Sequence, residues 1–425
     1  MKIFITGASG FIGSHLIERL RQTDHDLFCL VRRTSSIRNL EDAGVQLIWG
    51  DLREKDTLYA GMSGCDYVIH LAGAHTFWEP DSHVYSDINA GGTKNVMECA
   101  LETGIKKVIH LSDIAVYGKP STIPFNEDSV VGPRRFSEYA RSKYEGDLIS
   151  WGLFNKKGLP LIVLYPGVVL GRGNNRPSGD MIRRLVKHRL PAKAFMDSIH
   201  TFVHVRDLVE AIAICTEKKN IIGEHFIIGT HHVSIRELME MIGSISDAVL
   251  PGFTLPDPMV LMLSKILTQI ADIIKYPPPM QLSYDLMVTL KEGSVADGTK
   301  AQQELGITYS SIRDALSEEI NAPSLDEKLY DRRKAKRMQV DMSVAYRSEG
   351  QDHEESARLN NISEGGIFLE TDKPLDKGRY VSANLFGENV GQFIYVRGKV
   401  LRKTSKGMAI EITHSDQDIS RIFSG

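Results

Sequence analysis

The chain has 425 residues, more than one usual hydrophobic core accommodates, so its length predicts two or three domains. A formal net charge of -3 argues against a broad cationic surface for nucleic acid. The four cysteines show neither CxxC nor metal-like spacing, which favours reduced thiols over disulfides or a zinc site.

The first part of the chain alternates between strand-like and helix-like segments. Up to about residue 165, runs rich in β-branched residues are separated by segments of helical length, such as residues 89–103. This alternation predicts an α/β fold of the Rossmann type, a doubly wound parallel sheet with helices on both faces. The amino terminus enters the first strand without a cleavable leader, so a cytoplasmic location is expected. The strand runs are KIFIT, DLFCLV, VQLIW, YVIHLA, KKVIHLS and LIVLY.

A glycine-rich turn, TGASGFIG, follows the first predicted strand and precedes a helix. Gly7, Gly10 and Gly13 would permit a tight turn and a close backbone approach, and the helix amino terminus would favour a pyrophosphate. The spacing alone is weak evidence, but its position between a strand and a helix predicts a dinucleotide cofactor.

Two further strand ends bear on the choice of cofactor. The second strand ends near Arg32 and Arg33, where an acidic residue would be needed to bind the ribose 2'-hydroxyl of NAD. A guanidinium there could pair with a 2'-phosphate, so we favour NADP over NAD, with a solvated basic loop as the alternative. Asp51, at the end of the third strand, could bind the adenine amino group or cap a helix.

Tyr139 and Lys143 are the candidate catalytic pair. They stand four residues apart in EYARSKYEG, hence on one face of a predicted helix. The unperturbed pKa of a tyrosine hydroxyl is about 10, so a proton relay near neutral pH needs a nearby cation. Lys143 can supply that charge.

Residues 166–320 are more helical and irregular and are expected to form most of the substrate-binding part. Arg172 and the cationic run MIRRLVKHRL could hold the pyrophosphate of a nucleotide sugar, or could form a solvated surface. His200 and His204 lie on a predicted strand with no third ligand nearby in sequence, so no metal is expected.

The most apolar later stretch is MVLMLSKILTQIADIIKY, which begins at Met259. Lys265, Gln269 and Asp272 interrupt it, so it falls short of a membrane-spanning helix. We favour a substrate lid or a buried helix over a membrane-surface helix.

The predicted secondary structure changes near residue 321. Residues 321–331 form a polar linker, and residues 332–425 contain short strands separated by Gly, Asp, Asn and Lys, which predicts a small all-β barrel. Its opening RRKAKR offers guanidiniums that could clamp phosphates and stack on purines, or it could be a solvated or nucleic-acid-binding linker. The later NISEGG could let a guanine edge approach a serine and a glycine, or could merely close a hairpin.

Residues 1–320 resemble the extended short-chain dehydrogenase/reductases of the NAD-dependent epimerase/dehydratase family, closest to the dihydroflavonol-reductase and hydroxysteroid-dehydrogenase branch. The motifs are TGASGFIG, GDL, LAG, NAGGT, VYG, YARSK, YPGVVLGRGN and FVHVRD. The resemblance implies hydride transfer at a nicotinamide, with Tyr139 exchanging the substrate hydroxyl proton and Lys143 holding the ribose. The predicted cofactor-contacting residues are Gly7, Gly10, Phe11, Ile12, Gly13, Arg32, Arg33, Asp51, Leu52, Leu71, Ala72, Gly73, Tyr139, Lys143 and Pro166.

One catalytic position departs from the family pattern. Asp113 stands where the family carries the Ser or Thr that bonds the substrate oxygen, and Ser112 precedes it. Adjacent strand residues face opposite ways, so Ser112 could replace it only across a bulge. An ionised Asp113 would raise the pKa of Tyr139, which suits carbonyl reduction; a protonated one could donate the missing hydrogen bond, or the site could be impaired. Ile114 replaces the aspartate of sugar dehydratases, which argues against dehydration.

Residues 332–425, with RxxxR followed by NxSxxG, resemble the PilZ domain, a receptor for the bacterial second messenger cyclic di-GMP. The resemblance assigns the arginines to phosphate and guanine contacts and the second motif to the other guanine. The residues concerned are Arg332, Arg333, Arg337, Asn361, Ser363 and Gly366.

The prediction is therefore a bacterial NAD(P)-dependent oxidoreductase or epimerase that is regulated by cyclic di-GMP. Its substrate would be a nucleotide sugar or a small carbonyl or alcohol, and a homodimer is compatible with it. The alternatives are a catalytically impaired, cofactor-bound scaffold that acts as a cyclic di-GMP signalling adaptor, and an epimerase that keeps its cofactor through a full cycle.

Overall fold

The computed structural model describes residues 1–321, 338–348, 353–363, 366–387, 392–404 and 406–415. The chain divides into two compact units, Met1–Ala322 and Pro323–Gly425. Each unit has hydrophobic core residues of its own. Most of the expected linker, residues 321–331, lies outside the described residues.

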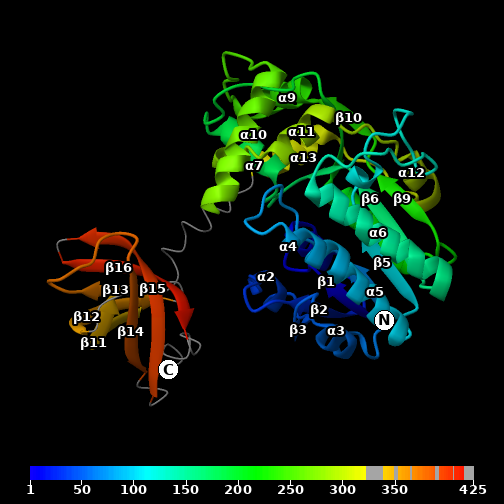
Figure 1. The fold of residues 1–425 in the computed structure, drawn as a ribbon. Coiled ribbons are helices and arrows are strands. Elements are labelled where there is room, and N and C mark those ends of the chain that lie inside the picture. The colour runs from blue at the N-terminus through cyan, green and yellow to red at the C-terminus, as the bar shows by residue number, and fades with distance from the viewer. Residues whose placement is uncertain (322–337, 349–352, 364–365, 388–391, 405, 416–425) are drawn as a thin grey trace. The chain divides into compact units, whose positions relative to one another are not determined.

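The first unit is built on a seven-stranded parallel sheet in the order β3-β2-β1-β4-β5-β6-β9 (Figure 1). The chain reverses direction across the sheet between β1 and β4. Open α/β sheets bind ligands at such a switch point, outside the carboxyl ends of the strands. The strands are β1 (Lys2–Thr6), β2 (Asp26–Val31), β3 (Gln46–Trp49), β4 (Tyr67–His70), β5 (Lys107–Leu111), β6 (Leu161–Pro166) and β9 (His225–Ile228).

Helices cover both faces of this sheet (Figure 1). Those of the first half are α1 (Phe11–Leu20), α2 (Arg38–Glu41), α3 (Lys55–Met62), α4 (His83–Tyr85), α5 (Thr93–Glu102) and α6 (Glu138–Lys157), with a π-helix at Ser86–Gly92 and a 3-10 helix at Ile114–Tyr117. Successive residues of β1 point into the hydrophobic cores on opposite faces of the sheet, because side chains alternate along a strand. Ile3 and Ile5 pack with α1, whereas Phe4 packs with α3 and α5. The predicted doubly wound fold is confirmed.

The rest of the first unit adds a smaller sheet and a group of helices. The sheet has the order β10-β8-β7, and a capping box between Ser234 and Glu237 starts the helix that follows β10. The elements are β7 (Val168–Leu170), α7 (Pro177–Val186), β8 (Ile199–His204), α8 (Val205–Glu217), β10 (His231–Ser234), α9 (Ile235–Ser246), α10 (Asp257–Ile274), a 3-10 helix (Pro279–Gln281), α11 (Tyr284–Glu292), α12 (Thr299–Leu305) and α13 (Ile312–Asn321).

Helix α10 corresponds to the long apolar stretch of the sequence, for which we expected a substrate lid or a buried helix; it is not a buried helix. Only Val260, Ser264 and Ala271 are buried along its length. The sequence is apolar enough for a buried helix, but no second layer of described residues covers its outer face. Within the described parts of the chain, no helix is long and apolar enough to cross a membrane.

The second unit is a closed antiparallel barrel, as predicted for the carboxyl-terminal module. Val344, Leu359, Leu369, Leu385 and Ile410 contribute to its core. They alternate with outward-facing residues, so closure of the sheet buries one face of every strand. Its described strands are β11 (Met338–Ser348), β12 (Glu355–Ser363), β13 (Gly366–Glu370), β14 (Tyr380–Gly387), β15 (Gln392–Thr404) and β16 (Gly407–Ser415), in the order β11-β12-β13-β16-β15-β14.

Candidate functional site

The glycine-rich turn joins β1 to α1 at the switch point of the sheet. Gly7 has a φ of +79°, in the left-handed region that glycine tolerates, and a Cβ on Gly13 would lie 2.1 Å from the Gly7 carbonyl oxygen. Helix α1 begins at Gly10 with no side-chain cap, which leaves backbone N–H groups of its first turn for an anion. Phe11 and Ile12 are buried there and anchor the turn in the core. This cradle fits a dinucleotide pyrophosphate.

The residues predicted to select the cofactor lie beyond β2 and β3. The side chains of Arg32 and Arg33 are exposed. Asp51 accepts hydrogen bonds from Arg53 Nε at 2.8 Å and Nη2 at 3.0 Å, and from the Arg53 backbone N–H at 3.0 Å. These bonds hold the pKa of Asp51 below its ordinary value. Both carboxylate oxygens of Asp51 therefore have a partner within the chain, and an adenine contact stays a prediction.

The other predicted cofactor positions also lie at or after strand ends. Leu71, Ala72 and Gly73 directly follow β4, and the Ala72 N–H donates to Thr6 Oγ1 at 3.2 Å. A Cβ on Gly73 would lie 2.9 Å from Asn89 Oδ1, so only glycine fits there without a shift. Their companions are the buried Leu52, after β3, and Pro166, the last residue of β6.

Tyr139 projects from the first turn of α6, which starts where the Ser137 hydroxyl caps the Ala140 N–H. Its hydroxyl donates to Asp113 Oδ2 at 2.8 Å. The other carboxylate oxygen of Asp113 accepts from the Ala115 N–H at 2.8 Å. Asp113 thus bridges the tyrosine and the short 3-10 helix after β5.

Burial and the neighbouring carboxyl group set the protonation of this pair. Burial raises the pKa of Tyr139 well above its ordinary value, and the negative charge of Asp113 raises it further. Burial also raises the pKa of Asp113, against the opposing effect of its hydrogen bonds. Burial and the charge of Asp113 both favour the protonated form of the Tyr139 hydroxyl.

Neither Lys143 nor Ser112 has a hydrogen bond to Tyr139 or Asp113 among the described contacts. Lys143 Nζ donates to the Leu111 carbonyl at 2.8 Å, and burial lowers the pKa of Lys143. The Ser112 hydroxyl is buried with no hydrogen-bond partner among the described residues. Asp113, and not Ser112, meets the Tyr139 hydroxyl, as the alternation of side chains along a strand requires.

Sequence reasoning missed three residues that the fold brings to Tyr139. The ring of His75 lies 4.7 Å from that of Tyr139, and the ring of Phe77 lies 5.6 Å from it. Arg176 caps α7 and places its guanidinium 5.9 Å from the ring of Phe11. The positive charge of Arg176 acts on Tyr139 against the rise in its pKa. Arg176 follows GRGNN directly, so the same motif could have pointed to it.

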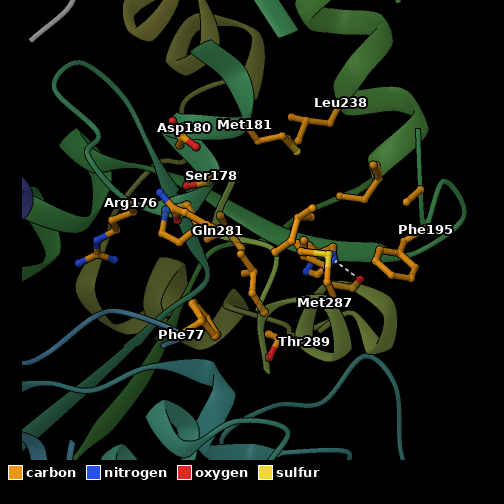
Figure 2. A pocket seen from close by; sticks show the side chains of 18 of the residues that line it. Phe77, Arg176, Ser178, Asp180, Met181, Phe195, Leu238, Gln281, Met287 and Thr289 are labelled. Carbon is orange, nitrogen blue, oxygen red and sulfur yellow. Dashed lines mark hydrogen bonds between the residues drawn. The ribbon is translucent and has the colours of Figure 1, made fainter. Parts of the chain in front are cut away.

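A cavity of about 360 Å³ opens beside this cluster and is lined by Tyr139, Asp113, His75, Phe77 and Arg176. Figure 2 shows side chains from α7, α9 and α11 around it. Most of the lining is aliphatic, aromatic or methionine. Representative members are Met181, Phe195, Leu238, Val260, Leu286 and Met287.

The cationic residues predicted to hold a pyrophosphate have other partners. Arg184 Nε donates to Asp180 Oδ2 at 2.6 Å within the cavity wall. Arg183 Nη1 donates to the Asn174 carbonyl at 2.6 Å. Arg172 Nη2 lies 3.3 Å from Glu18 Oε2. Lys187 is exposed and does not line the cavity.

The two strand histidines also have protein partners. His200 Nε2 bonds to the Leu290 carbonyl at 3.0 Å, and His204 Nδ1 accepts from the Arg206 N–H at 3.0 Å. In the parts of the chain that the structure describes, no group of three or more His, Cys, Asp or Glu side chains could hold a metal ion.

The predicted nucleotide site of the barrel is described only in part. Arg332, Arg333 and Arg337 lie outside the described residues. Asn361 and Ser363 are at the end of β12, and Gly366 starts β13 opposite Ser363. A Cβ on Gly366 would lie 2.7 Å from the Ile410 carbonyl oxygen, so β16 approaches closely there.

A glycine-rich turn at the switch point of a Rossmann-type sheet, next to a Tyr-xxx-Lys helix, defines a nicotinamide-dinucleotide enzyme. The model of the NAD dependent epimerase/dehydratase family matches residues 3–229, and the chain belongs to this family. The PilZ domain model matches residues 331–423, so a PilZ domain follows the enzyme domain. The predicted fusion is confirmed.

Two curated relatives match nearly the whole enzyme domain. The putative dihydroflavonol 4-reductase of Synechocystis sp. is 24% identical over 327 residues, 75% of this chain and 93% of its own. Sterol demethylase protein B of Methylococcus capsulatus is 25% identical over 326 residues, 75% of this chain and 97% of its own.

Among solved structures, UDP-glucuronic acid 4-epimerase from Bacillus cereus in complex with NAD superposes with a TM-score of 0.62. It is 24% identical, and the match covers 78% of this chain and all of the epimerase chain. At this identity the match shows the fold. The family as a whole depends on a nicotinamide dinucleotide.

Proposed function

We propose that the first unit is an NADP-linked reductase of an apolar ketone or aldehyde, and that cyclic di-GMP regulates it through the PilZ domain. The observation that carries the substrate class is the apolar cavity beside Tyr139. A nucleotide sugar would bring a pyrophosphate and several hydroxyl groups against aliphatic walls, where unpaired polar groups are costly. An apolar carbonyl compound fits these walls.

The charged groups of the cavity support the same substrate class. Arg184 is paired with Asp180, and Arg176 faces the ring of Phe11 in the glycine-rich turn. We assign Arg176 to the cofactor side of the site for that reason. The names of the two curated relatives refer to a dihydroflavonol and a sterol, both polycyclic compounds without a phosphate group.

The proposed reaction reduces a carbonyl group to an alcohol. A nicotinamide dinucleotide bound at the glycine-rich turn would supply the hydride to the carbonyl carbon. The Tyr139 hydroxyl would donate its proton to the carbonyl oxygen as the C=O double bond becomes a single bond. In the free site this hydroxyl donates its single proton to Asp113 Oδ2 at 2.8 Å, so the O–H would turn from Asp113 to the carbonyl oxygen when the substrate binds. Lys143 would contact the cofactor ribose when the cofactor displaces its bond to the Leu111 carbonyl.

The preference for NADP rests on the exposed Arg32 and Arg33 beyond β2, where a 2'-phosphate would lie. The regulatory part rests on the PilZ match together with the RxxxR and NxSxxG motifs. Arg333 and Arg337 would bind the messenger, with Arg332, Asn361, Ser363 and Gly366 completing the site. Regulation requires that the messenger bind two arrangements of the chain with different affinity.

The test is a substrate screen with the full-length protein. Oxidation of NADPH is followed by absorbance with steroid ketones, dihydroflavonols and long-chain aldehydes, and in parallel with UDP-sugars, each with and without cyclic di-GMP. We expect turnover of an apolar carbonyl compound and its loss by at least about a hundredfold in Tyr139→Phe. Turnover or epimerisation of UDP-sugars alone would overturn the substrate class.

A second candidate function is a cofactor-bound signalling scaffold without turnover, which Asp113 favours because it replaces the family Ser or Thr. Asp113→Ser separates the two. If wild type is inactive on every substrate and the variant turns one over, the scaffold is correct. Turnover by the wild-type protein would rule out the scaffold function.

A further inference from the structure

The outer face of α10 is strongly apolar and exposed. Exposure of its apolar side chains ranges from 45% at Ile266 to 80% at Ile273. Their recurrence every three or four residues places them along one face of the helix. We call these residues the α10 stripe: Met259, Met262, Ile266, Ile270, Ile273 and Ile274.

The α10 stripe is continuous with the cavity of the active site. Val260, Leu263 and Ser264 line the cavity from the same helix, and Leu263 is also 43% exposed. Figure 1 shows α10 on the side of the first unit that lies away from β1, β2 and β3. One wall of the cavity beside Tyr139 is therefore the inner side of a helix whose outer side is apolar.

A loop that carries cationic residues pairs through its backbone with the segment that leads into α10. The Lys193 N–H donates to the Phe253 carbonyl at 3.1 Å, and the Leu255 N–H donates to the Lys193 carbonyl at 2.9 Å. These bonds hold the loop that carries Lys187 and Arg189, both exposed, against the segment that leads into α10.

The same segment adds to the apolar surface, and the helix adds a further cation. Phe253 is itself 58% exposed, and Lys265 is exposed on α10. Of the two acids on the helix, Asp257 lies in its first turn, and Asp272 accepts a hydrogen bond from Trp78 Nε1 at 2.8 Å.

We propose that α10 docks on the surface of an anionic lipid bilayer, with the α10 stripe in the headgroup boundary and the loop of Lys187, Arg189 and Lys193 on lipid phosphates. A helix with one apolar face beside cations is suited to lie in the plane of a membrane surface. Docking does not depend on catalysis. Delivery of an apolar substrate from the bilayer into the cavity is the part that rests on the proposed function.

The test is sedimentation of the full-length protein with vesicles of phosphatidylcholine alone or mixed with phosphatidylglycerol, without substrate. We expect binding to the anionic vesicles that weakens with added salt. The stripe variant, Met262→Gln, Ile266→Gln, Ile270→Gln and Ile273→Gln together, should bind at least about tenfold more weakly. Lys187→Gln, Arg189→Gln and Lys193→Gln together should remove the preference for anionic lipid.

The matched control changes four exposed apolar side chains elsewhere: Ile123→Gln, Val130→Gln, Leu148→Gln and Ile222→Gln. It should bind vesicles as wild type does. The midpoint of thermal unfolding and the affinity for NADPH show that each variant is folded. Wild type that stays in the supernatant, or a stripe variant that binds like wild type, overturns the proposal.

Two further results would also overturn it. If the stripe variant differs from wild type only in its oligomeric state, the α10 stripe contacts a second copy of the chain. If the control variant loses as much vesicle binding as the stripe variant, the loss reflects general surface polarity and not the α10 stripe. A third result separates the two proposals. If the protein reduces a dispersed apolar ketone but does not bind vesicles, the docking proposal is wrong and the proposed function stands.

Discussion

The carboxyl group at position 113 changes what Tyr139 can do. A serine or threonine there would donate a hydrogen bond without carrying a charge. Asp113 instead accepts the tyrosine proton in a 2.8 Å hydrogen bond and adds a negative charge to a buried site. Both effects favour the protonated tyrosine, which is the form that the proposed carbonyl reduction requires.

Asp113→Asn tests this bias. The amide keeps the shape of the side chain and removes the charge, so the pKa of Tyr139 should fall. Alcohol oxidation requires the deprotonated tyrosine, and its rate in wild type should rise only at high pH. In the variant, the midpoint of that rise should move to lower pH by about one unit. The measurement is the pH profile of kcat/KM for oxidation; an unchanged midpoint would mean that Asp113 is neutral in the site.

The sequence predicted the site residues that lie close together in the chain. Tyr139 and Lys143 share a helix face because they stand four residues apart. The family resemblance identified Asp113 as the residue in place of the usual Ser or Thr. His75 and Arg176 were missed because their contacts join segments that only the tertiary fold brings together. The GRGNN motif stands directly before Arg176, but it does not say that Arg176 approaches the glycine-rich turn.

Helix α13 fixes the loop that leads to Arg176 and is the last described element before the residues that connect to the second unit. Glu319 Oε2 accepts from the Gly171 N–H at 3.1 Å and from Asn174 Nδ2 at 3.3 Å. Its other carboxylate oxygen is buried with no hydrogen-bond partner among the described residues. Burial raises the pKa of Glu319 to about 7.

This pKa predicts a pH-dependent stability. Between a pKa of 4.5 in the unfolded chain and about 7 in the folded one, the folded state binds more protons. The free energy of unfolding should therefore fall as the pH rises through this range, by at most about 3 kcal/mol. In Glu319→Gln the contribution is absent. Thermal unfolding midpoints between about pH 5 and about pH 8 should fall less steeply than in wild type.

The control for this experiment is Glu240→Gln, at an exposed position of α9. Its midpoints should follow those of wild type across the same range. If Glu319→Gln also follows wild type, Glu319 is ionised in the folded protein and the loop is held in another way.

The glycine-rich turn before α1 should tolerate no side chain at Gly13. In Gly13→Ala the new Cβ would lie 2.1 Å from the Gly7 carbonyl oxygen, so the turn must open. The affinity for NADPH, measured by fluorescence or calorimetry, should fall by about tenfold or more. Gly152→Ala in α6 meets no atom within 4 Å and should keep wild-type affinity. Equal affinities in the two variants would contradict the cradle.

Sequence patterns predicted the barrel and six of the seven strands of the large sheet, because alternating side chains and turn residues are local signals. Strands β7, β9 and β10 were not predicted. The role of α10 was harder to predict. An apolar helix of this length has the same composition whether another layer covers it or not, and the sequence does not say what lies on its outer side.

An enzyme domain and a PilZ domain share one chain, and the two proposed ligand sites should be separable by substitution. Arg333→Ala with Arg337→Ala should abolish cyclic di-GMP binding in calorimetry, because the guanidiniums supply the phosphate contacts. The affinity for NADPH should stay at the wild-type value. Unchanged affinity for cyclic di-GMP would refute the assignment of these arginines.

In the proposed reaction, a hydride passes from a nicotinamide to an apolar carbonyl compound held beside Tyr139. The most direct measurement uses NADPH deuterated at the transferred position and mass spectrometry of the product. The account predicts an alcohol that carries one deuterium from wild type, and none from Tyr139→Phe. Unlabelled apolar carbonyl compounds, recovered unchanged from a protein that epimerises UDP-sugars, would contradict it.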